Sequence, residues 1–144
     1  MKRIIAYKRF DSVKSSVPWW YSISARALPC GILFQFLTAG LSLFRDDSLW
    51  ALHEVSGLIL AVFPGILLGG SLLVSRLGRF GWWASLTGLL YLFQIALSAG
   101  AEPELIAYHP FNGALLLTAS LILLMKVERR LGKATSGQSI KHPV

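Results

Sequence analysis

Two histidines occupy matching places in this sequence. The pentapeptides at residues 53–57 (HEVSG) and 109–113 (HPFNG) each begin with a histidine and end with a glycine. Each follows a segment in which Leu-Phe-Gln is followed by Ala-Gly, at residues 33–40 and 92–100. A pattern that recurs in this order indicates an internal repeat, in which equivalent residues occupy equivalent positions in space.

The chemistry that such a pair of imidazoles can perform is axial ligation of a metal. Two neutral histidines that face each other across a helical bundle are the ligands that a b-type haem requires. The sequence therefore predicts one haem b, with His53 and His109 as its metal ligands.

Four neighbouring positions fit the same cofactor. Gly57 and Gly113 lie four residues after the two histidines, one helical turn away on the same face. The missing side chain would let a flat porphyrin approach the backbone. Ser56 and Asn112 border that face and are expected to hydrogen-bond a ligand.

Three further polar residues complete the predicted site. Gln35 and Gln94 carry amides within apolar segments, where an unpaired polar group is costly. We expect them to bond a second residue of the site, a quinone or each other, and Arg45 to pair with haem propionates. The alternative is that the histidines only hydrogen-bond a neighbouring helix and that the small residues permit close packing.

The elements that position these residues are four long apolar segments. Each approaches or exceeds the roughly 20 residues that cross a bilayer. We predict an all-α fold, an integral membrane four-helix bundle made of two tandem two-helix repeats. A basic leader (1–21) precedes the bundle. A tail (128–144) follows it and is expected to be disordered from Gly132. Pro64 should kink the second helix. The expected spans are about Ser22–Phe44, Leu49–Leu73, Phe80–Gly100 and Leu105–Val127.

The charges predict the orientation. The chain has a net charge of +7, and of its 14 lysines and arginines only Arg45 falls on the side where the acids cluster. Because short loops rich in Lys and Arg remain in the cytoplasm, we expect both termini there. This distribution argues against nucleic acid as a partner. The expected partner is the lipid bilayer, with attraction to its anionic head groups.

The remaining segments exclude several alternatives. Cys30 is the only cysteine, which excludes an internal disulfide, a cysteine-based zinc site and covalent haem attachment. The leader does not have the pattern of a cleavable signal peptide. It is expected to lie along the membrane surface or to dock on other membrane subunits.

The elements His53-x-x-x-Gly57 and His109-Pro110-x-Asn112-Gly113 also carry a resemblance. The chain resembles a family of small prokaryotic four-helix membrane proteins whose activity is not established, and it looks like four-helix b-type cytochromes. The resemblance covers about Leu28–Val127 and implies a four-helix bundle with the two histidines as candidate haem ligands. We expect the protein in the prokaryotic inner membrane. Di-haem cytochromes of that class carry four ligating histidines, so at most one haem is expected here.

The leading hypothesis is therefore a small b-type cytochrome that transfers electrons between a quinol and a periplasmic or partner-bound acceptor. The rival hypothesis is a non-catalytic accessory subunit of a larger respiratory or photosynthetic membrane complex. A transporter or channel is the third and weakest, because charged residues deep in the spans are lacking.

Overall fold

The computed structural model describes residues 17–99 and 103–139. Most of the basic leader and the end of the tail, with His142, lie outside them. In the described residues the chain forms four helical spans, each long and apolar enough to cross a membrane, so this is a multi-pass membrane protein. The helices are α2 (Trp19–Phe44), α3 (Leu49–Leu60), α4 (Val62–Leu73), the 3₁₀ helix η1 (Ser75–Phe80), α5 (Gly81–Ala99), α6 (Pro103–Ile106) and α7 (His109–Ser139).

The second span is broken where the sequence predicts a kink. Pro64 has no N–H to donate to the carbonyl of Leu60, and its ring crowds that carbonyl. The break falls one turn before the proline, at Ala61, whose N–H donates to the carbonyl of Leu58 at 3.1 Å. The prediction of a kink is confirmed, and it divides this span into α3 and α4.

The start of the fourth span differs from the prediction. The fourth helix was expected to begin at about Leu105, with His109 several residues inside it. Instead α6 ends at Ile106, and His109 is the first residue of α7. The cause is Pro110, which has no N–H to bond the carbonyl of Ile106 and is tolerated only in a first turn.

The end of the fourth span also differs. Disorder was expected from Gly132, but α7 continues through it to Ser139. A glycine inside a helix destabilises it by only about 1 kcal/mol relative to alanine. Val127 is fully buried and Leu131 packs against the core, so these contacts hold the helix beyond the predicted boundary.

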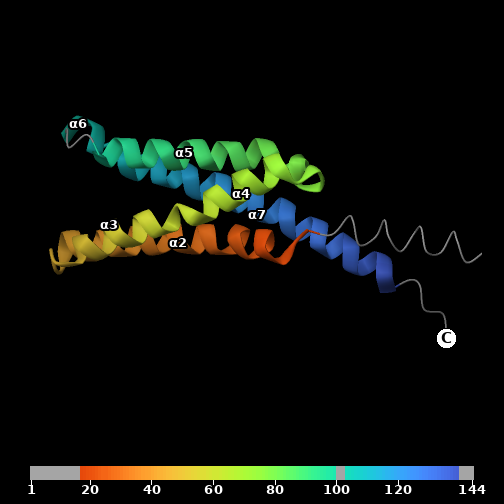
Figure 1. Ribbon diagram of the computed structural model, residues 1–144. Coiled ribbons are helices and arrows are strands. Elements are labelled where there is room, and N and C mark those ends of the chain that lie inside the picture. The colour runs from red at the N-terminus through yellow and green to blue at the C-terminus, as the bar shows by residue number, and fades with distance from the viewer. Residues whose placement is uncertain (1–16, 100–102, 140–144) are drawn as a thin grey trace, which may run out of the picture.

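The four spans pack as two hairpins (Figure 1). α2 lies beside α3, and α5 lies beside α7. α4 crosses from the first hairpin to the second, where it contacts both α2 and α5. We call the end that contains α3, α6 and the turn at residues 45–48 the histidine end. The basic end contains η1, the start of α2 and the last turns of α7.

The apolar core is concentrated toward the basic end. Its fully buried side chains include Tyr21, Leu67 and Leu123. By contrast, Leu60 is the only buried residue of α3, and the buried residues of the histidine end include the polar Thr38 and Asn112. The two hairpins are therefore held together mainly at one end, and polar contacts become important at the other.

Candidate functional site

The imidazoles of His53 and His109 face each other between the two hairpins. Their ring centres are 6.3 Å apart and their planes are inclined by 58°. His53 comes from α3 and His109 from α7, which belong to different hairpins. The indole of Trp50 meets the His53 ring edge to face at 5.5 Å. Two residues that are 56 positions apart in the sequence are thus brought together, as the repeat predicts.

The His53 ring is oriented by α2. Its Nδ1 lies 3.2 Å from the backbone carbonyl of Gln35 and 3.1 Å from the hydroxyl of Thr38. A carbonyl only accepts, so this contact places the proton on Nδ1 and leaves the lone pair on Nε2. No hydrogen bond of that Nε2 to a described residue is found, and so it is the nitrogen with which His53 can bind a ligand.

The His109 ring has a different environment. Its Nδ1 is buried and has no hydrogen-bond partner in the described residues. The repeat explains this asymmetry, because the position that matches Thr38 is Leu97, three residues after Gln94. Leu97 is buried and apolar, so it supplies no hydroxyl to the second histidine. A buried nitrogen without a partner is costly.

The amide of Gln35 bridges α2 to the helix that carries His53. Its Oε1 lies 2.7 Å from the hydroxyl of Ser56 and 3.1 Å from the N–H of Gly57, and its Nε2 lies 2.9 Å from the carbonyl of His53. This amide orientation places Nε2 against the carbonyl of His53 and Oε1 against the N–H of Gly57, whereas the reverse would place Oε1 against that carbonyl.

Gln94 makes the equivalent contacts in the second hairpin. Its Nε2 donates to the carbonyl of His109 at 3.1 Å, and its Oε1 accepts from the amide of Asn112 at 2.5 Å. Asn112 also donates to the carbonyl of Leu90 at 2.9 Å. Both glutamines therefore bond the carbonyl of a histidine and the polar side chain three residues after it. The repeat is preserved in its hydrogen bonds as well as in its sequence.

The two glycines lie against these amides. A Cβ at Gly57 would lie 3.1 Å from the amide of Gln35. A Cβ at Gly113 would lie 3.2 Å from the ring of Phe36 and 3.4 Å from Nε2 of Gln94. The sequence interpretation assigned the missing side chains to contact with a porphyrin. In the structure the same space accommodates glutamine and phenylalanine side chains.

The two hydrogen-bonding networks should differ in strength. Asn112→Leu should lower the free energy of unfolding by roughly 1–3 kcal/mol, because it leaves buried polar groups without a donor. Ser56→Ala, the matched change in the first hairpin, should have a smaller effect because Oε1 of Gln35 keeps the N–H of Gly57. Thermal unfolding in detergent, followed by circular dichroism, measures both. Equal losses would contradict the asymmetry.

Arg45 is not brought to this pair. It lies at the exposed end of α2, and no hydrogen bond or ion pair joins its side chain to a described residue. In the same turn, hydrogen bonds from the side chain and backbone of Ser48 lower the pKa of the Asp46 carboxyl. Within residues 17–99 and 103–139, no group of three or more His, Cys, Asp or Glu side chains is placed to hold a metal ion. Any metal here would need ligands beyond the two histidines, as a porphyrin provides.

Sequence reasoning missed several residues of the site. Thr38 and Trp50 both contact His53, and the hydroxyl of Tyr91 on α5 donates to the carbonyl of Gly57 on α3. Thr38 lies three residues after Gln35, a spacing that places both on one helical face, so it could have been found. Nothing in the sequence pattern indicates the contact of Tyr91, because it joins the two hairpins.

Comparison with known proteins gives one finding. Residues 35–101, just under half of the chain, are similar to a family of unknown function (DUF6220). This match includes His53 and ends before His109, so it does not extend to the His-Pro-x-Asn-Gly element. No curated protein and no solved structure matches the chain.

Proposed function

We propose that this chain is a b-type cytochrome-like membrane protein that binds one haem between His53 and His109. The observation that carries the proposal is the pair of facing imidazoles with ring centres 6.3 Å apart. Two imidazoles that bind opposite sides of one metal ion through bonds of about 2 Å have ring centres roughly 6 Å apart. The separation therefore suits one iron atom between the rings.

The chemistry of the ring nitrogens also supports this proposal. Ligating histidines are oriented by a hydrogen bond to their other nitrogen, and Nδ1 of His53 has such a bond to the carbonyl of Gln35. The buried, unpartnered Nδ1 of His109 is a polar atom that a ligand would satisfy. His53 would bind iron through Nε2, and His109 through a ring nitrogen.

In this proposal a flat cofactor lies between the helices that carry the two histidines. α3 packs on α2, and in the described residues only Leu60 of α3 is buried. A porphyrin bound to both histidines would lie between the two hairpins, with its edge toward the bilayer. The amides of Gln94 and Asn112 line the second hairpin, where a quinone could also bond.

A bound haem would supply reversible one-electron chemistry. The chain would then transfer electrons between a membrane quinol and an acceptor at the same side. On the positive-inside rule, the basic end faces the cytoplasm with both termini, and the histidine end faces the outside of the prokaryotic inner membrane. His53 and His109 are the only histidines in the described residues, so a second bis-histidine haem is not proposed.

Optical spectroscopy tests the proposal. The full chain, purified in a mild detergent, should bind added haemin in a 1:1 ratio. Its reduced spectrum should then have the sharp α-band of six-coordinate, low-spin iron. The pyridine haemochrome assay measures the ratio. A folded preparation that takes up no haem, and whose absorbance is that of haemin in detergent alone, would refute it.

A second candidate is a non-catalytic accessory subunit of a larger complex. The observation that favours it is the same uncovered face of α3, which a helix of another subunit could cover. Leu52 and Val55 are exposed there. A photoreactive amino acid at position 55 should then give one defined crosslink in native membranes. The same label at Leu89, exposed on α5, is the control, and equal crosslinking from both positions would contradict this alternative.

A further inference from the structure

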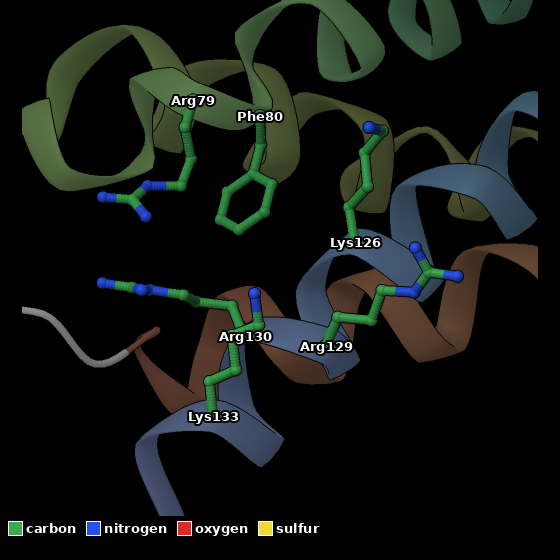
Figure 2. Close-up of a pocket in the computed structure, with 6 residues that line it drawn as sticks. All are labelled: Arg79, Phe80, Lys126, Arg129, Arg130 and Lys133. Carbon is green, nitrogen blue, oxygen red and sulfur yellow. The ribbon is translucent and has the colours of Figure 1, made fainter. Parts of the chain in front are cut away.

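The basic end carries a hollow lined almost entirely by cations. It has a volume of about 310 Å³ and lies between η1 and the last turns of α7. Arg79 and Arg130 extend to the same side of it, one from each helix, and the ring of Phe80 lies beside Arg79 on the side of Lys126 (Figure 2). The lining residues are Arg79, Phe80, Lys126, Arg129, Arg130 and Lys133.

No acidic side chain in residues 17–99 and 103–139 forms an ion pair with these cations. The only ion pair in the described residues joins Arg26 to Glu128 at 2.7 Å, so the nearest acid on α7 is already paired. Lys126 lies over the ring of Trp83, with its Nζ 5.7 Å from the ring centre. Five cations around one hollow repel each other, and the electrostatic cost falls when an anion enters.

The chemistry of the lining selects the anion. Arginine guanidinium groups bind phosphate oxygens through paired hydrogen bonds, and lysines add point charges. A phosphate group can contact Arg79 from η1 and Arg130 from α7 together. The ring of Phe80 is buried at the hollow and offers an apolar surface next to the charges.

The position of the hollow favours a lipid as the source of the phosphate. It lies at the ends of the membrane spans, where Trp82 is 74% exposed at the level preferred by interfacial aromatic residues. Above Arg129, at spacings of four residues on the same face of α7, Met125 and Leu121 are exposed and apolar. An acyl chain can follow this stripe while its head group occupies the hollow.

We propose that this hollow is a binding site for the phosphate head group of an anionic phospholipid, such as phosphatidylglycerol. This lipid site does not depend on haem binding, because the residues of the hollow lie at the opposite end of the bundle from the histidines. The site would select phosphate-bearing lipids with a net negative charge over zwitterionic ones. It would also fix the depth of η1 and α7 at that surface.

Native mass spectrometry of the full chain in a neutral detergent tests the site. Titration with dioleoylphosphatidylglycerol should give one tightly bound lipid, and dioleoylphosphatidylcholine should give none at the same concentration. A cation next to an anionic head group contributes a factor of about five to its binding, so the double variant Arg79→Gln/Arg130→Gln should weaken it roughly 25-fold. Arg76→Gln is the matched control, since Arg76 is an exposed cation of η1 outside the hollow.

The outcomes separate the alternatives. A loss confined to the hollow variant supports the site, and Arg76→Gln should change affinity less than about twofold. If the two variants lost the same affinity for phosphatidylglycerol per removed charge, the lipid would be attracted to the whole basic surface, and the proposal of a site would be wrong. Inorganic pyrophosphate is the second probe. If it binds and phosphatidylglycerol does not, the hollow takes a soluble phosphate and the lipid assignment is wrong.

Discussion

Replacing either His53 or His109 by alanine is expected to abolish six-coordinate haem binding and with it the sharp reduced α-band. The removal of a residue that only orients a metal ligand lowers metal affinity by roughly 10–100-fold. Loss of the ligand itself should exceed this, so haem affinity should fall by more than about 100-fold. Haemin titration and reduced-minus-oxidised spectra of the purified variants measure the change. Both variants should lose the band, because the proposed iron needs both rings.

His142 offers the control, as it is the third histidine of the chain and has no part in the proposed site. His142→Ala should keep the spectrum and the 1:1 ratio. His109→Gly gives a second test, since free imidazole should restore the band if the ring acts as a ligand. A structural role predicts no such rescue. Persistence of the band in either alanine variant would contradict bis-histidine ligation.

The described part of the chain follows the sequence in its broad architecture for simple physical reasons. Apolar length sets the four spans, and the proline at position 64 sets the kink, because a missing N–H breaks a helix wherever it occurs. The boundaries were less accurate. His109 begins its helix because Pro110 follows it, and α7 passes Gly132 because Val127 and Leu131 are packed. Packing against distant residues is not visible in a local pattern.

The internal repeat predicted which residues meet but not how they bond. It placed Gln35 and Gln94 in equivalent positions, and the structure gives them equivalent partners. It did not indicate that Thr38 would bond His53 while Leu97 leaves Nδ1 of His109 without a partner. Such differences arise where the two copies of the hairpin have different residues at one position. Their effect on the hydrogen bonds of the histidines is visible only in the folded structure.

The sequence pattern also did not predict the basic hollow. From the sequence, the cations of η1 and α7 were interpreted only as signals of orientation under the positive-inside rule. Arg79 and Arg130 are 51 positions apart, and they share one hollow because η1 folds against the last turns of α7. A charge count predicts an attractive surface, whereas a selective site requires this tertiary contact.

A second large effect is expected at Gly70, where α4 crosses α2. A Cβ there would lie 2.8 Å from the indole of Trp20 and 3.1 Å from the ring of Tyr21. Tyr21 has little freedom to move, because it is fully buried, bonds Ser71 through its hydroxyl at 2.8 Å and stacks on Phe80. Overpacking a well-packed core destabilises a protein by roughly 1–3 kcal/mol.

Gly70→Val should therefore lower the free energy of unfolding by about that amount, measured by denaturation in mixed detergent micelles and followed by circular dichroism. Gly69→Val is the matched control. A Cβ at Gly69 would meet nothing within 4 Å, yet the residue lies in the same turn of the same helix. Because both changes alter helix propensity equally, their difference isolates the contact with Trp20 and Tyr21. Two variants of equal stability would mean that α4 does not pack on α2 in this register, and the hairpins would then have to join in another way.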